Sequence, residues 1–359
     1  MIAGGGTGGH IFPAIAIAKA LKQMLPECEI LFVGAKGKME MQKIPEAGFP
    51  VEGIDIAGFN RSSLMKNIAL PLKLMQSFWQ VHSIFRRFTP DAVIGVGGYS
   101  SFPVLRYAQW KGVPTFIHES NSFAGKSNQL LAKRAVNVFT GAEGMEKFFP
   151  PGKVLCTGNP VRQELSAAKA QREEGSLFFG LDPKKKTLLV TGGSLGAKGI
   201  NDAVAQQLSV LKEMDIQLIW QTGTSYEDKA RSLCAGYGGC WTGAFIRSMA
   251  LAYSAADVVV SRAGAMTIAE LCVMGKAAVF VPYPFAAEDH QTVNAAQMVD
   301  KGAALMVKDS EAAEKLIPVV IQLLGDRETL NRMADRMRQL AVADADTRIA
   351  HAILKYFER

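Results

Sequence analysis

The stretch GGGTGGHIFPAIAIA at residues 4–18 is a glycine-rich run that passes directly into an apolar segment. A second such run, TGGSLGA at residues 191–197, follows the strand-like residues 187–190. Glycines between a strand and a helix let the backbone approach a ligand closely, and the N–H groups at the helix start favour anions. The two runs therefore predict two turns suited to phosphate groups in one chain.

The regions around these two turns repeat each other. The next strand-like run lies 26 positions after Gly5, at Leu31, and 25 positions after Gly193, at Leu218. Further β-branched runs at residues 92–98 and 113–117 correspond to runs at 257–264 and 277–281. Short strands that alternate with helix-length segments are typical of βαβ units in a parallel sheet. We predict two Rossmann-like α/β domains, with ligands at the carboxyl ends of the strands.

Composition is that of a globular enzyme. The 359 residues suffice for two domains, and the chain is 48% hydrophobic and 20% charged. No uncharged apolar run reaches the roughly 18–20 residues of a membrane span, and no signal peptide is expected before the first glycine turn. The five cysteines are scattered without CxxC spacing, which favours reduced thiols over disulfides or a zinc site.

The net charge of +7 is concentrated in one stretch, because residues 56–90 contain no acidic residue. Its basic residues are Arg61, Lys66, Lys73, Arg86 and Arg87, and they alternate with many large apolar residues, among them Trp79. This mixture indicates an anionic membrane surface as a partner. An ordinary packed helix with solvated lysines is the alternative, and Pro71 would interrupt a single long helix. Nucleic acid is not expected, since no recognition module is present.

Gly4, Gly6 and Gly9 also satisfy the GxGxxG pattern of dinucleotide-binding domains. That pattern requires an acidic residue at the end of the second strand, to hold the ribose. Residues 33–38, at the end of the expected second strand, read VGAKGK and contain no carboxylate. A nicotinamide cofactor is therefore not predicted.

Six motifs occur in an order that resembles the MurG family across nearly the whole chain. They are GGGTGGHIFPA at 4–14, GVGGYSS at 95–101, HESN at 118–121, GNPVR at 158–162, GGSLGA at 192–197 and SRAGAMTIAEL at 261–271. The family's enzymes are bacterial N-acetylglucosaminyltransferases that convert lipid I to lipid II in peptidoglycan synthesis. The resemblance implies a GT-B fold, in which two Rossmann-like parallel-sheet domains face each other across a cleft. It also implies UDP-N-acetylglucosamine as donor and undecaprenyl-pyrophosphoryl-MurNAc-pentapeptide (lipid I) as acceptor.

The resemblance assigns most donor contacts to the second half of the chain. Glu270 would hold the ribose hydroxyls, Ser194 the phosphates, and the backbone of Ile246 the uracil. Arg162 would contact the nucleotide, and Asn121 and Gln291 the transferred sugar. The remaining expected donor contacts are Thr7, Gly8, Gly9, Ala265, Met266, Thr267, Ile268 and Ala269. Ordinary structural roles remain open: a helix cap for Ser194 and Asn121, a helix-start carboxylate for Glu270, and a surface linker for Arg162.

Gly97, Gly98 and Tyr99, with the first glycine turn, would face the acceptor's pyrophosphate. The family commonly has HEQN where this chain has HESN, so Ser120 departs from the pattern while His118, Glu119 and Asn121 match it.

The implied reaction is a single displacement with inversion at the anomeric carbon. His10 is our candidate for the general base, because a helix start disfavours the imidazolium ion and keeps the ring able to accept a proton. Glu119 is the reserve, and His10 could instead only orient the turn. We expect neither a metal nor another cofactor, because helix N-termini and backbone N–H groups can stabilise the departing pyrophosphate.

The expected domains are an acceptor and membrane-associating domain at 1–160 and a donor domain at 161–343. A terminal helix at 344–359 is expected to pack back on the first domain, with Ile349, Ile353, Leu354 and Phe357 on one side. The predicted location is peripheral, on the cytoplasmic face of the inner membrane, where other cell-wall synthesis proteins are further expected partners. Three alternatives stay open: a GT-B transferase with another lipid acceptor such as diacylglycerol, a sugar-nucleotide epimerase, and a non-catalytic subunit that binds polyprenyl-linked lipid.

Overall fold

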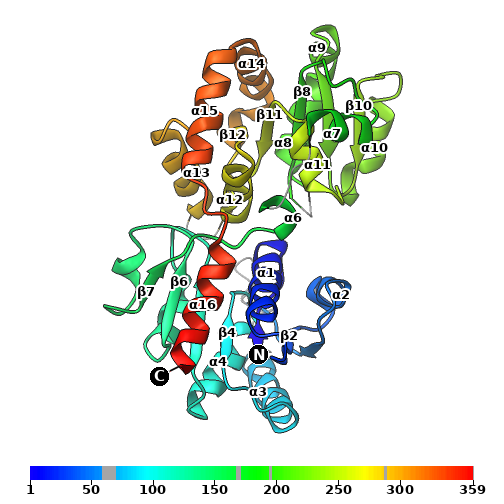
Figure 1. Cartoon of the computed structure of the whole chain (residues 1–359). Helices are drawn as coiled ribbons and strands as arrows, with labels where there is room; N and C mark the ends of the chain where they lie inside the picture. Colours follow the sequence, from blue (N-terminus) through cyan, green and yellow to red (C-terminus); the bar gives the residue numbers. More distant parts are fainter. Residues whose placement is uncertain (59–69, 167–170, 194–195, 287–288, 359) are drawn as a thin grey trace. The chain divides into compact units, whose positions relative to one another are not determined.

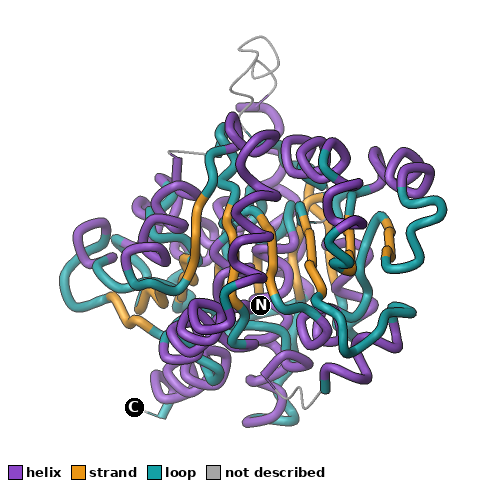
Figure 2. The backbone as a smooth tube through the Cα atoms, turned by 90° about the horizontal axis from the view of Figure 1, so that it is seen from above, coloured by secondary structure: helices purple, strands orange, loops and turns teal. Residues whose placement is uncertain are grey.

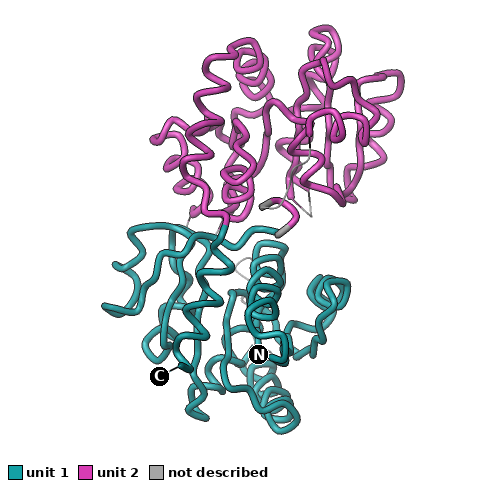
Figure 3. The backbone as a smooth tube through the Cα atoms, in the orientation of Figure 1, with its two compact units in different colours: residues 1–162, 344–359 teal, residues 163–343 magenta. Residues whose placement is uncertain are grey.

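The structure is a computed structural model that describes residues 1–58, 70–166, 171–193, 196–286 and 289–358. The chain divides into two compact units, residues 1–162 with 344–359 (unit 1) and residues 163–343 (unit 2), shown in two colours in Figure 3. Each unit contains one parallel sheet flanked by helices (Figures 1 and 2). The prediction of two Rossmann-like domains is confirmed.

The sheet of unit 1 has the strand order β3-β2-β1-β4-β5-β6-β7. Its strands are β1 (Ile2–Ala3), β2 (Phe32–Ala35), β3 (Val51–Ile54), β4 (Val93–Gly95), β5 (Thr115–Glu119), β6 (Asn137–Thr140) and β7 (Val154–Cys156). Its longer helices are α1 (Gly8–Met24), α2 (Glu40–Glu46), α3 (Leu70–Arg87), α4 (Ser101–Trp110), α5 (Lys126–Ala132) and α16 (Ala345–Phe357).

Successive strand residues of unit 1 enter two separate cores, one on each face of the sheet. Phe116 and Ile94 belong to the core that also contains residues of α1 and α16, whereas Ile117 and Val93 belong to the core beneath α3 and α4. All four side chains are at most 3% exposed. A parallel sheet covered on both faces needs such continuous apolar strands, which is why these runs were visible in the sequence.

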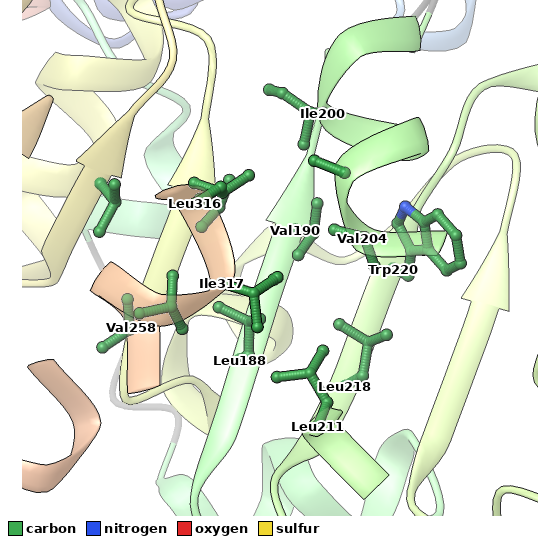
Figure 4. Close-up of a cluster of buried hydrophobic side chains, with 14 of the residues drawn as sticks. Leu188, Val190, Ile200, Val204, Leu211, Leu218, Trp220, Val258, Leu316 and Ile317 are labelled. Atoms are coloured by element: carbon green, nitrogen blue, oxygen red, sulfur yellow. The ribbon is translucent and has the colours of Figure 1, made fainter. Parts of the chain in front are cut away.

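The sheet of unit 2 has the order β10-β9-β8-β11-β12-β13. Its strands are β8 (Thr187–Thr191), β9 (Gln217–Gln221), β10 (Cys240–Gly243), β11 (Val258–Ser261), β12 (Ala277–Phe280) and β13 (Ala304–Met306). Its helices are α6 (Gln163–Ser166), α7 (Arg172–Phe178), α8 (Lys198–Gln206), α9 (Leu208–Glu213), α10 (Glu227–Leu233), α11 (Met249–Ala255), α12 (Ala265–Met274), α13 (His290–Asp300), α14 (Ala312–Gly325) and α15 (Arg327–Gln339). Figure 4 shows the core on one face, which contains Leu188, Leu218 and Val258 from three strands together with Ile317 of α14.

Strand order reverses at one place in each sheet, between β1 and β4 in unit 1 and between β8 and β11 in unit 2. At such a switch point the connections after neighbouring strands lead to opposite faces and leave room for a ligand at the carboxyl ends. The two glycine turns follow β1 and β8, and Gly97 and Gly264 lie just after β4 and β11. The topology thus assigns one candidate site to each unit.

The terminal helix α16 packs against α1 in unit 1. Ile349 and Ile353 are buried and Leu354 packs against the same core, whereas Phe357 is 48% exposed. Phe357, in the last turn, thus lies largely outside the core, although the neighbouring Tyr356 still packs its ring against Phe116 of β5 with ring centres 5.8 Å apart. Among the described residues, no helix combines the length and the apolar character needed to cross a bilayer.

Candidate functional site

In unit 1 the first glycine turn links β1 to α1. Thr7 is the N-cap of α1 with extended backbone (φ −145°, ψ 157°), and Gly8 and Gly9 begin the helix. The first N–H groups of a helix have no intrahelical acceptor, so this end of α1 offers donors to an anion. Thr7, Gly8 and Gly9, all predicted as ligand contacts, therefore lie at the switch point of the sheet.

Glu40, which was not among the residues predicted from the sequence, stabilises this turn by hydrogen bonds. Its buried carboxylate accepts the N–H of Gly6 at 2.8 Å and the N–H of Ala35 at 2.9 Å. A Cβ on Gly5 would lie 2.3 Å from that carboxylate, so only glycine fits there. An internal carboxylate thus occupies the Gly6 donor, and the turn is not open to phosphate along its whole length. The only sequence signal was an acidic residue in the first turn of the helix after β2.

His10 lies in the first turn of α1 with a defined tautomer. Its Nδ1 is 3.2 Å from the carbonyl oxygen of Gly5 and 3.3 Å from the hydroxyl of Thr7. Because a carbonyl oxygen only accepts, Nδ1 carries the proton and Nε2 keeps a lone pair. Burial lowers the pKa of His10 below its ordinary value, although nearby Glu119, the hydrogen bond to Gly5 and Glu40 oppose the shift. The ring is therefore neutral near pH 7 and has a basic atom at Nε2.

Gly97 and Gly98 form the turn after β4, next to His10. Their φ angles are +95° and +87°. A Cβ on Gly97 would lie 2.7 Å from His10 Nε2, and one on Gly98 would lie 2.2 Å from the Gly5 carbonyl oxygen. The fold thus brings Gly97, Gly98 and His10 together, and the contacts leave no room for larger residues. Tyr99 is 55% exposed in the same turn.

Glu119, at the end of β5, has a buried carboxylate with four hydrogen bonds. Its Oε1 accepts from the backbone and side-chain nitrogens of Asn121 at 3.2 and 3.3 Å. Its Oε2 accepts from Gly125 N at 3.1 Å and from Asn128 Nδ2 at 2.9 Å. These bonds order the loop between β5 and α5. They also orient the Asn121 amide, which does not cap the helix, because α5 begins at Lys126 with Gly125 as its N-cap.

Arg162 is the last residue of the first segment of unit 1. Its guanidinium carbon lies 3.9 Å from the centre of the Phe12 ring in α1, a cation–π distance. This contact holds Arg162 next to the start of α1.

In unit 2 the second glycine turn follows β8. Ser194 lies outside the described residues, as does Leu195. Gly192 and Gly196 bound the turn with very close backbone contacts, since Cβ atoms on them would lie 2.2 Å from Ala197 N and the Thr222 carbonyl oxygen. The turn therefore requires glycine on both sides of the expected phosphate position.

Ile246 lies in the connection between β10 and α11 and is 1% exposed. Its N–H donates to Gln221 Oε1 at 3.0 Å. A base that approaches Ile246 would therefore meet its carbonyl oxygen, or would have to displace Gln221 from the N–H. Gln221, at the end of β9, was not among the predicted residues.

The loop after β11 leads into α12, whose N-cap is Gly264. The predicted contacts at residues 265–269 form the first turn and a half of α12 and are all half-buried. Glu270 comes sixth in the helix, 6% exposed, and Oε2 of its carboxylate accepts from the Tyr253 hydroxyl at 3.0 Å. A carboxylate at this depth is too far along the helix to act on its N-terminal N–H groups. The alternative of a helix-start carboxylate is thus unsupported, and Tyr253 orients Glu270.

Gln291 lies in the first turn of α13, where its Oε1 accepts from Tyr283 N at 3.0 Å. The loop that carries Tyr283 is held by Arg262, whose guanidinium donates to the carbonyl oxygens of Val281 and Pro282, both at 3.0 Å. Arg262 also pairs with Asp309 at 2.5 Å. The segment next to Gln291 is thus fastened to the end of β11.

Two family models match the chain: the glycosyltransferase family 28 N-terminal domain over residues 1–140 and the family 28 C-terminal domain over residues 187–349. The chain is 47% identical over 99% of its length, and 94% of the relative's, to a Bacteroides fragilis protein. It is also 47% identical over its whole length, and 98% of the relative's, to one from Parabacteroides distasonis. Both are named UDP-N-acetylglucosamine–N-acetylmuramyl-(pentapeptide) pyrophosphoryl-undecaprenol N-acetylglucosamine transferase.

Among solved structures, that of Acinetobacter baumannii MurG matches with a TM-score of 0.76 and 31% identity, covering 99% of this chain and 98% of that one. Full-length identity at this level, together with the two parallel-sheet units and both family 28 domains, confirms the GT-B fold and the predicted family. The chain belongs to the MurG family of family 28 glycosyltransferases.

Proposed function

We propose that this enzyme transfers N-acetylglucosamine from UDP-N-acetylglucosamine to the 4-hydroxyl of the muramyl sugar of lipid I, which yields lipid II for peptidoglycan synthesis. The observation that carries the proposal is the full-length 47% identity to transferases whose name states this reaction. The two switch-point sites support it, because one chain then has a separate site for each phosphorylated substrate.

Unit 2 is proposed as the donor domain. The glycine turn with Ser194 would take the UDP phosphates, Ile246 the uracil and Glu270 the ribose diol. A carboxylate can accept from both hydroxyls of a diol in charge-assisted hydrogen bonds of about 1.5–3 kcal/mol each. Residues 265–269 would line the ribose and phosphates, and Gln291 would hold the sugar by an amide that both donates and accepts. The N-termini of α8 and α12 would stabilise the leaving UDP without a metal.

Unit 1 is proposed as the acceptor domain, with His10 as the general base. The lone pair on Nε2 takes the proton of the acceptor's 4-hydroxyl while that oxygen attacks the anomeric carbon. The bond between this carbon and the UDP oxygen breaks, and UDP leaves with the electron pair, so the configuration inverts. Gly97, Gly98 and Tyr99, with the first turn, would face the acceptor's pyrophosphate. Arg162 and Asn121 would reach the donor from this unit.

Glu119 fits a positioning role better than that of a base. All four of its hydrogen bonds come from N–H donors, and they use both carboxylate oxygens. Proton abstraction would require at least one of these bonds to break in a buried place, which costs about 1–3 kcal/mol for the donor left unpaired. His10 needs no such rearrangement.

A surface of α3 and α4 supports membrane contact by unit 1. Leu72, Met75 and Trp79 are 61–73% exposed, and their spacing puts them on one side of α3. Trp110, 55% exposed at the end of α4, stacks on Phe78 with ring centres 4.9 Å apart. We name Leu72, Met75, Trp79 and Trp110 the apolar patch.

Three cations lie on or next to the helices that carry the apolar patch. Lys73 and Lys111 are exposed, Arg106 lies over the Trp110 ring, and neither helix contains an acidic residue. Pro71 is the second residue of α3, so it does not interrupt the helix over Leu70–Arg87. Arg61 and Lys66 lie outside the described residues. Exposed apolar side chains with nearby cations suit an anionic bilayer, at about 1 kcal/mol per well-placed cation. We therefore propose a peripheral location on the cytoplasmic face of the inner membrane, with other cell-wall synthesis proteins nearby.

The test is transfer of labelled N-acetylglucosamine from UDP to a short-chain lipid I analogue in detergent with EDTA. A disaccharide-lipid product supports the proposal and a metal-free mechanism. Transfer to diacylglycerol instead would identify another lipid acceptor, and a changed sugar nucleotide formed without any acceptor would identify an epimerase. UDP binding without turnover would indicate a non-catalytic subunit. The absence of both turnover and UDP binding would refute the proposal.

A further inference from the structure

Gln221 lies between the two parts of the candidate donor site in unit 2. It is the last residue of β9 and is 3% exposed. In the sheet it is paired with Thr191 of β8 on one side and Gly243 of β10 on the other. β8 runs into the glycine turn, and β10 runs into the segment that carries Ile246. The buried side chain of Gln221 therefore lies at the point where these two connections leave the sheet.

The carboxamide of Gln221 joins the two connections by hydrogen bonds. Its Oε1 accepts from Ile246 N at 3.0 Å, and its Nε2 donates to the Gly193 carbonyl oxygen at 2.9 Å. The partners define the amide orientation, because one is a donor and the other an acceptor. A glutamate has no donor for Gly193, and a methionine of similar length lacks both groups.

These two bonds restrict backbone groups on either side of the site. The peptide between Phe245 and Ile246 is planar and trans, so an anchored N–H turns the Phe245 carbonyl oxygen in the opposite direction. Gly193 has φ +78°, and its carbonyl oxygen also accepts Gly196 N at 3.0 Å across the turn. Gln221 thus links the conformation of the glycine turn to that of the Ile246 segment.

We infer that Gln221 is a positioning residue for the donor, which sets the separation between the turn that takes the phosphates and the segment that takes the base. The inference rests on the proposed function, since it presumes that unit 2 binds a uridine diphosphate. Gln221 acts through the backbone of Gly193 and Ile246, because its side chain is only 3% exposed and both ends of its amide are bonded to these two backbone groups. It affects how well the nucleotide fits and which base is accepted.

The matched control is Gln217 on the same strand. Gln217 is 4% exposed and also bridges backbone groups, since Oε1 accepts from Asp182 N at 2.7 Å and Nε2 donates to the Asp182 carbonyl oxygen at 2.8 Å. It lies at the opposite end of β9 from Gln221, where the strand begins. Gln217→Met therefore removes similar buried bonds from the same sheet and leaves the candidate site untouched.

The experiment measures the Kd of UDP and CDP by calorimetry, the donor KM and kcat, and the Tm of the whole chain and its variants. We expect Gln221→Met to weaken UDP binding roughly 5- to 100-fold, as expected when a buried N–H and a buried carbonyl lose their partner. The donor KM should rise in parallel while kcat at saturating donor changes little, and the preference for UDP over CDP should fall. Gln217→Met should lower the Tm and leave Kd, KM and base preference unchanged.

Gln221→Glu provides a second variant of the same shape. Glutamate keeps the acceptor for Ile246 but places a carboxylate oxygen against the Gly193 carbonyl oxygen. Because Gly193 belongs to the turn proposed for the phosphates, affinity for UDP should fall more than affinity for uridine. Unchanged UDP affinity and base preference in both folded variants would overturn the inference. Tighter UDP binding by Gln221→Met would also overturn it, because Gln221 would then compete with the base for Ile246. An unaltered chain that neither binds UDP nor transfers sugar would refute the proposed function itself.

Discussion

Replacement of His10 by asparagine separates the two roles that this residue can have. The Asn side-chain NH₂ can take the place of Nδ1–H and donate to the Gly5 carbonyl oxygen, so the turn keeps its contact. No atom of asparagine replaces Nε2, the basic atom beside Gly97. His10→Asn therefore removes the base and retains the hydrogen bond, whereas His10→Ala removes both.

The expected loss follows from general-base catalysis, which contributes about 10²–10⁴-fold to the rate, or about 3–5.5 kcal/mol of barrier. We expect His10→Asn to lower kcat by this factor and to leave the Kd of UDP unchanged, since unit 2 is proposed to hold most of the donor. His82→Asn is the control, because His82 lies in the same unit with its Nδ1 2.7 Å from the Tyr107 hydroxyl. It should retain full activity.

The pH profile of the unaltered enzyme tests the same assignment. Burial lowers the pKa of free-enzyme His10 below about 6.5, so the ring is neutral above that pH. The value of kcat/KM reports groups of the free enzyme. As far as His10 is concerned, it should be constant from pH 7 upward and should fall as the pH drops through the lowered pKa of His10. Two results would refute the assignment: a loss of less than threefold in His10→Asn, or an acidic limb of the kcat/KM profile that inflects above pH 7.

Three further predictions concern stability and the membrane. Glu40→Gln should destabilise unit 1 by about 2–4 kcal/mol, because an amide has one acceptor oxygen for the two N–H groups that the carboxylate serves. Hydrogen exchange of peptides spanning residues 1–6 and 32–35 measures this loss. The control, Glu46→Gln, removes an exposed ion pair and should change stability little. Burial lowers the pKa of His118 to about 4, below its unfolded value of about 6.5. The contribution of neutral His118 to the free energy of unfolding is therefore complete above pH 6.5, and it falls by on the order of 3 kcal/mol toward pH 4. Urea unfolding at several pH values should show this slope, and a His118→Gln variant with the same slope would contradict the prediction. Trp79→Ala should weaken binding to anionic vesicles about tenfold or more without affecting turnover of a short-chain acceptor. The control is Leu177→Ala in unit 2, where Leu177 is 65% exposed and Trp79 is 73% exposed; this variant should bind like the unaltered chain. Equal vesicle binding by both variants would argue against the apolar patch.

Much of the fold was readable from local patterns. The strands β5, β8, β9 and β12 lie within one or two residues of the runs that predicted them, and β11 lies inside the run at 257–264. These runs are conspicuous because both faces of each parallel sheet are covered by helices, so nearly every strand residue is apolar. The glycine turns were equally visible, since close backbone contacts such as that of Gly196 with Thr222 exclude every other residue.

The site could be predicted only in part, because a sequence reveals local patterns and not contacts between distant residues. Residues of the ligand turns are contiguous in sequence, and the order of the motifs was enough to indicate the family. The supporting residues are not contiguous: Glu40 lies 34 positions from Gly6, and Gln221 lies 28 from Gly193 and 25 from Ile246. Nothing in a single sequence indicates which polar side chain will meet a distant backbone group.

The sequence alone therefore determined the two-domain parallel architecture and the places where ligands meet the backbone, because apolar periodicity and glycine requirements are local properties of the chain. Only the tertiary structure decided the state of the groups in those places. It assigned the proton of His10 to Nδ1, occupied the Gly6 N–H with Glu40 and the Ile246 N–H with Gln221, and saturated the carboxylate of Glu119. Each of these outcomes depends on hydrogen bonds between atoms that folding brings together, and a buried polar group takes the partner that the fold presents to it.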